Sequence, residues 1–181
     1  MKKLIRENKG FLVFLLLFGV FRTAVADWNP IPSGSMRPNL LEGDVVFVNR
    51  LAFDLKVPLT DVVVARLGEP ARGEVVTFSS PKDGTRMIKR IIALPGDVVE
   101  MRDERLVVNG VAADYALVGE MPEEVGSSGM YTAAFKLEET MGGKQRPILV
   151  MPQIAAARSF APVTVPPDQF MMLGDNRDNS A

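Results

Sequence analysis

Apolar residues recur in short runs along most of this chain, and glycine, proline, asparagine or aspartate separates one run from the next. The runs are rich in β-branched and aromatic residues, which between turn formers indicate β-strands. The candidate strands are residues 45–49, 62–65, 75–78, 85–94, 98–101, 106–108, 147–150, 163–165 and 170–173. No internal repeat or long amphipathic helix accompanies them, so the pattern predicts a mainly β protein.

Two features of the middle of the chain refine this prediction. Residues 98–101 and 106–108 have the pattern of a hairpin pair, and Asn109-Gly110 is a strong signal for a tight turn. Between residues 111 and 140, Gly, Ser, Glu and Met mix without a clear period. We therefore expect that part of the chain to be an insertion with little regular structure.

The N-terminus joins a basic stretch, residues 1–9, to an apolar segment, residues 10–26. One interpretation is a cleavable signal peptide, because the small-x-small pattern Ala24-Val25-Ala26 precedes Asp27. The other is a membrane anchor whose basic end lies in the cytoplasm. The segment is at the lower limit of about 17 residues for a spanning helix, and Arg22 interrupts it near its end. Both interpretations place the rest of the chain outside the cytoplasm.

The amino-acid composition excludes several kinds of partner and of catalytic site. The 181 residues carry 21 Lys and Arg against 22 Asp and Glu, so no charge bias favours nucleic acid as a partner. The chain has no His and no Cys, which excludes a Ser-His-Asp triad, a thiol nucleophile, a disulfide, and histidine-ligated or thiolate metal sites. A serine hydrolase of this composition needs a lysine, a carboxylate or an N-terminal amine as its base. We expect no metal and no cofactor.

A loop between two prolines is the first candidate for that chemistry. Residues 31–40 read IPSGSMRPNL, and the two prolines restrict the backbone around them. Ser33 and Ser35 flank Gly34, an arrangement that suits a nucleophile with an oxyanion donor beside it. Taken alone, the same four residues are also typical of an ordinary surface loop.

Lys89 is the candidate base. If residues 87–92 form a strand, Lys89 shares one face with Met87 and Ile91. Apolar neighbours on that face would desolvate the amine and lower its pKa, and a shift from about 10.4 to about 7 corresponds to about 4 kcal/mol. The alternative is an edge-strand lysine that points into water.

Four blocks of the sequence together resemble bacterial type I signal peptidases, which are membrane-anchored Ser/Lys proteases. The blocks are IPSGSMRPNL at 31–40, GDVVFVNRLAFDLKVP at 43–58, RGEVVTF and MIKRIIALPGD within 72–97, and GDNRDNS at 174–180. The resemblance implies a transmembrane anchor followed by a β-rich catalytic domain with a smaller inserted β-rich region. The implied boundaries are a cytoplasmic tail at 1–9, an anchor at 10–26, a catalytic core at 27–99 and 166–181, and a variable insertion at 100–165.

The resemblance also implies roles for individual residues. Ser35 corresponds to the nucleophile and Lys89 to the general base. The Ser33 hydroxyl would join the Ser35 backbone N–H in the oxyanion hole, and Ser180 would orient the lysine. Apolar residues around the dyad would line shallow pockets for small substrate side chains: Ile31, Pro32, Met36, Leu40, Ile88, Met172 and Leu173.

The implied function is removal of signal peptides from exported preproteins after small residues at the −1 and −3 positions. The implied place is the bacterial cell (inner) membrane, with the N-terminus cytoplasmic, the catalytic domain on the outer side, and the lipid bilayer as a partner. This favours a retained anchor over a cleavable signal peptide. In the family, an acidic residue, a serine and an arginine follow the GDNRDNS block, whereas this sequence stops at Ala181. We therefore expect the chain to fold better than it cleaves.

Two alternatives stay open. Another Ser/Lys protease, such as the self-cleaving repressors of the DNA-damage response, would be cytosolic and carry a DNA-binding domain. A membrane-tethered β-domain without catalytic activity could bind exported peptides.

Overall fold

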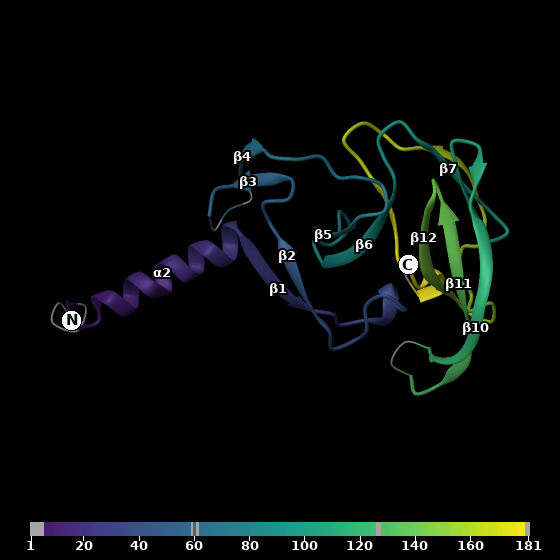
Figure 1. The fold of residues 1–181 in the computed structure, drawn as a ribbon, viewed down its shortest axis with the longest axis horizontal. Helices are drawn as coiled ribbons and strands as arrows, with labels where there is room; N and C mark the ends of the chain where they lie inside the picture. The colour runs from purple at the N-terminus through teal and green to yellow at the C-terminus, as the bar shows by residue number, and fades with distance from the viewer. Residues whose placement is uncertain (1–5, 59, 61, 126–127, 180–181) are drawn as a thin grey trace. The chain divides into compact units, whose positions relative to one another are not determined.

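The computed structural model describes residues 6–58, 60, 62–125 and 128–179, and its chain forms two compact units (Figure 1). The first unit combines residues up to Pro30 with Val45–Pro70. The second combines Ile31–Asp44 with the chain from Ala71 onward. Both candidate catalytic residues, Ser35 and Lys89, therefore belong to the second unit.

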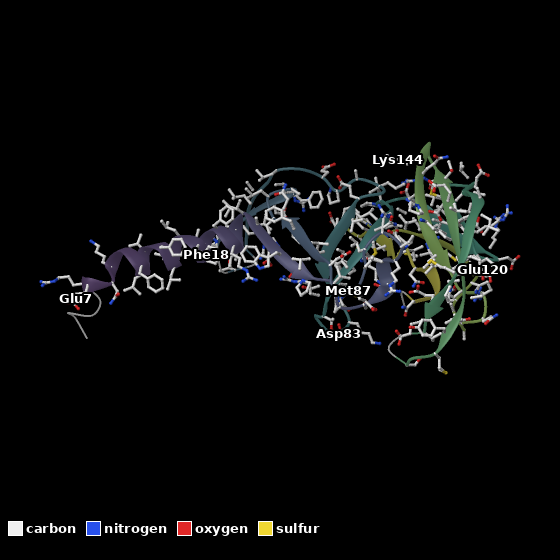
Figure 2. The ribbon with its side chains drawn as sticks, turned by 60° about the horizontal axis from the view of Figure 1, so that its bottom comes forward. Glu7, Phe18, Asp83, Met87, Glu120 and Lys144 are labelled. Carbon is white, nitrogen blue, oxygen red and sulfur yellow. The ribbon has the colours of Figure 1, made fainter. Side chains whose placement is uncertain are left out.

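Among the residues that the structure describes, the first unit contains one helix and two small antiparallel sheets. Helix α2 (Lys9–Ala24) leads into β1 (Ala26–Pro30), which pairs with β2 (Val45–Asn49), and β3 (Asp54–Lys56) pairs with β4 (Val63–Arg66). The apolar side chains of α2 are largely exposed, and Figure 2 shows Phe18 among those that project from it. In the described part of the chain, no helix combines the length and the apolar character needed to cross a membrane.

The described part of the second unit contains three sheets and two short 3-10 helices. One sheet has the order β14-β6-β5, the second β13-β7-β8-β9 and the third β10-β11-β12. The elements are η1 (Gly34–Met36), β5 (Val75–Ser79), β6 (Arg86–Ala93), β7 (Val98–Arg102), β8 (Arg105–Val108), β9 (Val111–Ala112), β10 (Asp114–Glu124), β11 (Tyr131–Met141), β12 (Lys144–Val150), β13 (Phe160–Thr164), β14 (Met171–Leu173) and η2 (Arg177–Asn179).

A hydrophobic core draws side chains from all three of these sheets, because β6, β7, β8 and β11 each contribute to it. Its buried members are Ile92, Ala93, Val99, Met101, Leu106, Val108, Ala113, Met141 and Val165. A smaller cluster of Ala134, Leu149 and Met151 lies under the third sheet. Removing these apolar surfaces from water stabilises the unit and fixes the strand that carries Lys89.

The mainly β prediction is confirmed, and several predicted strands agree with observed ones. Strand β2 has the predicted bounds, and β6 lies within predicted residues 85–94. Strands β7 and β8 form the predicted hairpin. Asn109 and Gly110 have φ values of 53° and 79°, as a tight turn between β8 and β9 requires.

The prediction of little regular structure over residues 111–140 is wrong. That part of the chain contains β10 and β11, which are 11 residues each and pair antiparallel from Asp114↔Thr140 to Glu124↔Tyr131. The reason is that Glu123 and Glu139 occupy buried positions. Carboxylates at interior positions break the alternation of apolar and polar residues by which strands are recognised.

Candidate active site

The serine loop, residues 31–40, turns tightly at its two serines. Ser33 is extended, with φ −148° and ψ 155°, and the 3-10 helix η1 follows it. The Ser33 hydroxyl donates to Ser35 Oγ at 3.5 Å. A Cβ added to Gly34 would lie 3.3 Å from Arg37 Nε and from Glu42 Oε1, so glycine lets the loop close on these two side chains. Ser35 itself is buried.

Asn176 holds this loop from the far end of the chain. Its backbone N–H donates to the Ser35 carbonyl at 3.1 Å, and its side-chain Nδ2 donates to the Gly34 carbonyl at 3.2 Å. Asn176 is fully buried and also forms a parallel bridge with Leu149. Two consecutive carbonyls of the serine loop are therefore fixed by one residue.

Lys89 lies on β6, the central strand of its sheet, opposite Val76 of β5. The residue is 5% exposed, and its face of the strand also carries buried Ile91. Burial lowers the pKa of Lys89, and the negative charge of Asp175 acts in the opposite direction without cancelling this shift. A desolvated amine of this kind is suited to accept a proton.

Arg90 and Asp175 join the lysine strand to the serine loop. Arg90 donates to both carboxylate oxygens of Asp175, from Nε at 2.8 Å and from Nη2 at 2.6 Å, and to the Gly73 carbonyl at 2.7 Å. Asn39 donates to Asp175 Oδ2 at 2.7 Å. The hydrogen bond to Asp175 raises the pKa of Arg90 despite its burial. Because Asp175 precedes Asn176, the same short segment contacts both β6 and the serine loop.

The residues expected to line substrate pockets differ in exposure. Ile31 and Met36 are buried, and Pro32 is exposed. Leu40, Ile88, Met172 and Leu173 are half-buried, and Leu173 packs against the core of the unit. Ser180, expected to orient the lysine, lies outside the described residues.

Sequence reasoning gave no role to Arg90, Asp175, Asn176 or Asn39, although all four stand inside the quoted blocks. One signal was present: strand alternation puts Arg90 on the face opposite Lys89. When a strand carries a cation on each face, each cation needs a carboxylate partner or must become neutral. The partner of Arg90 is Asp175, which lies just after β14. Arg90 and Asp175 are 85 positions apart, so the sequence pattern did not predict that they pair.

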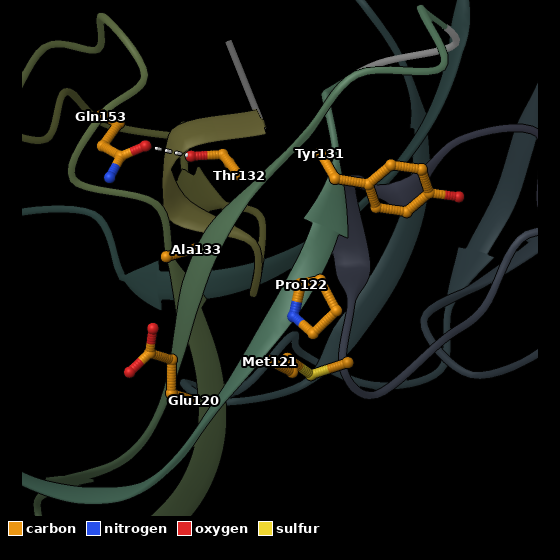
Figure 3. Close-up of a pocket in the computed structure, with 7 residues that line it drawn as sticks. All are labelled: Glu120, Met121, Pro122, Tyr131, Thr132, Ala133 and Gln153. Carbon is orange, nitrogen blue, oxygen red and sulfur yellow. Dashed lines mark hydrogen bonds between the residues drawn. The ribbon is translucent and has the colours of Figure 1, made fainter.

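An open hollow lies elsewhere, on the β10–β11 hairpin (Figure 3). It encloses about 570 Å³ and is lined by Glu120, Met121, Pro122, Tyr131, Thr132, Ala133 and Gln153. Thr132 Oγ1 donates to Gln153 Oε1 at 2.7 Å on one side of it. None of the candidate catalytic residues lines this hollow. Among the described residues, no three carboxylates gather in a way that could hold a metal ion.

Comparisons with known proteins identify the family of this chain. The family model "Signal peptidase, peptidase S26" matches residues 4–181. Signal peptidase I of Pseudomonas fluorescens is 35% identical and that of Pseudomonas aeruginosa 36% identical, each over 179 residues. The alignment covers 98% of this chain but 61% of each relative, so the chain spans about three fifths of their length.

A crystal structure of a signal peptidase I from Enterococcus faecalis V583 is 29% identical, covering 64% of this chain and 84% of that one, with a TM-score of 0.34. The match of the family model over nearly the whole chain, together with the two Pseudomonas relatives, decides the family. The chain belongs to the signal peptidase family, peptidase S26.

Proposed function

We propose that this protein is a membrane-bound serine endopeptidase that removes signal peptides from exported preproteins after small-x-small sites. Ser35 is the nucleophile and Lys89 the general base. The observation that carries the proposal is the burial of Lys89 on a central strand, which lowers its pKa in a chain that has no histidine. Family membership supports the reaction class.

The proposed reaction begins with neutral Lys89, whose Nζ takes the Ser35 Oγ proton as Oγ attacks the scissile carbonyl. The oxyanion that forms is stabilised by the Ser35 backbone N–H and by the Ser33 hydroxyl. Protonated Lys89 then gives its proton to the leaving amine, and the signal peptide remains as an acyl ester on Ser35. Water, deprotonated by Lys89, hydrolyses this ester and restores both groups.

Two neighbouring groups support these roles. Ser33 is exposed and already donates to Ser35 Oγ, so its hydroxyl needs only to turn to reach an oxyanion beside that atom. Arg90 engages both oxygens of Asp175. This pairing offsets the negative charge of Asp175, which would otherwise hold the proton on Lys89. Ser180 completes the proposal as the residue that orients the amine.

We propose that small substrate side chains bind beside the dyad. The half-buried side chains of Leu40, Ile88, Met172 and Leu173, with exposed Pro32, can contact a peptide that lies along the serine loop. Ile31 and Met36 are buried and would form the floor. Bulky side chains at the −1 and −3 positions would then be excluded by lack of space.

The membrane part of the proposal rests on the first unit. We propose that residues 10–26 anchor the chain with residues 1–9 in the cytoplasm, and that the catalytic core, residues 27–99 and 166–181, works on the outer side. The exposed apolar surface of α2 supports this placement. So does Arg22, whose guanidinium lies 4.5 Å from the Trp28 ring centroid, because arginine and tryptophan are typical of the membrane interface. Residues 100–165 form the variable insertion.

The test is a cleavage assay in lipid vesicles. The whole protein is reconstituted and given a preprotein with an Ala-x-Ala site, and the product is sequenced from its N-terminus. We expect one cut directly after the second alanine by the wild type and none by Ser35→Ala at equal folded concentration. Cleavage by Ser35→Ala would contradict the assigned nucleophile. A wild type that binds the preprotein without cutting it would show a binding domain instead.

A further inference from the structure

The β10–β11 hairpin contributes two carboxylates that water hardly reaches. Glu123 is 3% exposed and Glu139 is 0% exposed. A buried carboxylate destabilises a fold unless opposite charges and hydrogen bonds compensate it. Each of these carboxylates pairs with an arginine from one of the two loops that build the candidate active site, and Glu139 pairs with a second arginine on β12 as well.

Glu123 binds the serine loop. Its Oε1 accepts from Arg37 Nη1 at 2.6 Å, and Glu42 Oε2 accepts more weakly from Arg37 Nη2 at 3.4 Å. Arg37 stands two positions after Ser35, and its backbone N–H donates to the Gly34 carbonyl at 3.1 Å. The guanidinium therefore ties the end of η1 to strand β10.

Glu139 binds the loop that follows β14. Its Oε2 accepts from Arg177 Nη2 at 2.6 Å and from the Tyr115 hydroxyl at 2.9 Å, while Oε1 accepts from Arg146 Nε at 2.6 Å. Burial alone would raise the pKa of Glu139, but the charges of Arg177 and Arg146 outweigh burial and lower it. The carboxylate is thus held charged next to Arg177.

The contacts of Glu123 and Glu139 both act on the backbone around Ser35, through different residues. Arg177 directly follows Asn176, which donates to the Ser35 and Gly34 carbonyls. Glu139 therefore reaches the serine loop through Arg177 and Asn176, whereas Glu123 reaches it through Arg37. We propose that Glu123 and Glu139 are positioning residues that hold the Ser35 hydroxyl and backbone N–H in place for the reaction.

This inference rests on the proposed role of Ser35 and extends the catalytic apparatus into the variable insertion. Neither carboxylate touches substrate in this scheme, so both act only through the geometry of the loop. A displacement of about 1 Å at a reacting group can slow a reaction by about 100-fold. A small relaxation of either contact is thus enough to affect turnover.

The experiment compares Glu123→Gln and Glu139→Gln with the wild type in the vesicle assay. Both substitutions keep the size of the side chain and remove its charge. We expect kcat to fall by about 10- to 100-fold in each variant while KM changes by less than about twofold. Glu100→Gln is the matched control, because Glu100 also pairs with an arginine, Arg102, but on strand β7. It should keep the kcat of the wild type.

Pairwise coupling tests the route of the effect. Arg37→Met should lower kcat about as much as Glu123→Gln, and the double variant should lose no more than the larger single loss. If the two losses multiply instead, Glu123 does not act through Arg37 and the proposal is wrong for that residue. A kcat that stays within about twofold of the wild type in both glutamine variants overturns the proposal entirely.

Amide hydrogen exchange of the peptide 31–40, measured without substrate, separates positioning from loss of folding and from failure of the proposed reaction. All variants are compared at equal folded fraction by circular dichroism. We expect exchange in this peptide to quicken at least fivefold in both glutamine variants and to stay unchanged in Glu100→Gln. Unchanged exchange in both glutamine variants overturns the proposal. If the wild type does not cleave at all, the proposed function fails, and exchange alone still decides whether the hairpin holds the loop.

Discussion

Lys89 and Arg90 are neighbours on strand β6, yet the two faces of this strand treat their charges in opposite ways. On one face the amine of Lys89 is buried and its pKa is lowered by desolvation. On the other face the guanidinium of Arg90 meets Asp175 at 2.6 Å, and this hydrogen bond raises its pKa. The two-residue period of a strand is what allows adjacent cations to differ so much.

The difference shows how one strand can carry both a proposed base, Lys89, and a structural charge, Arg90. A lysine loses its proton readily when it is desolvated, whereas an arginine stays charged in proteins and binds a carboxylate through two parallel hydrogen bonds. Arg90 thus pairs with Asp175, and among the described residues the remaining effect of that carboxylate on the pKa of Lys89 does not cancel the effect of burial. Exchanging the two residue types would remove both properties.

The largest expected effect comes from replacing Lys89, the proposed base. Lys89→Ala and Lys89→Arg should each lower kcat by about 10⁴-fold or more, because the alanine has no proton acceptor and the guanidinium cannot become neutral. Steady-state cleavage of a preprotein measures the loss. Arg86→Lys, at the exposed start of the same strand, should keep normal activity. Substantial activity in Lys89→Arg would show that both faces of β6 are structural.

The next effect concerns the Arg90 face and is one of stability. Arg90→Met should lower the free energy of unfolding by about 3–5 kcal/mol, because it leaves the buried Asp175 carboxylate without its cation. Urea unfolding measures this change. Asp175→Asn added to Arg90→Met should recover part of the loss, since no unpaired charge then remains. If Arg90→Met alone is as stable as the wild type, the Arg90–Asp175 ion pair does not hold the loop after β14.

Ser33→Ala tests whether the serine loop stabilises the negative charge that forms in the proposed reaction with Lys89. Losing one oxyanion donor should raise the barrier by roughly 2.7–4 kcal/mol, or about 10²- to 10³-fold in kcat, while the free energy of unfolding stays nearly unchanged. Ser33 is exposed, so little packing is lost. Single-turnover kinetics with the preprotein gives the value. A normal rate would leave the Ser35 N–H as the sole proposed donor.

The smallest effect is on pH dependence, and it follows from the lowered pKa of Lys89. The rate should rise about tenfold per pH unit below that pKa and level off above it, because only the neutral amine accepts a proton. Stability should also rise with pH between the folded pKa and about 10.5, since the unfolded lysine binds its proton more tightly. Lys89→Met should abolish this second slope in urea unfolding across pH. If the rate levels off at a pH that differs from the pH at which stability begins to rise, a group other than Lys89 controls the rate.

Local pattern was enough to predict much of the fold. Alternation along residues 85–94 predicted β6 and put Lys89 on the same face as buried Ile91. The hairpin of β7 and β8 and the turn at Asn109 followed from the same rules. In each case the residues that determine the structure are close together in sequence.

Pattern failed where charge is buried or where partners are far apart. A glutamate in this sequence context is expected at the surface. The burial of Glu139 depends on its hydrogen bonds with Tyr115, Arg146 and Arg177, which lie on other parts of the unit. Asp175 and Arg90 are 85 positions apart, so no window of sequence contains both. The roles of Asn176 and Asn39 depend equally on tertiary contacts. A rule based on neighbouring residues cannot assign such partners.

The hydrogen bond from Asn176 to Gly34 spans 142 positions, and this separation affects how the protein folds during its synthesis. A ribosome adding about 5–20 residues per second needs roughly 7–28 s to travel from one residue to the other. During that interval the serine loop has been translated but lacks the residue that fixes its two carbonyls. Translation itself therefore delays the maturation of the loop, and a nascent chain carries Ser35 well before it carries a finished site.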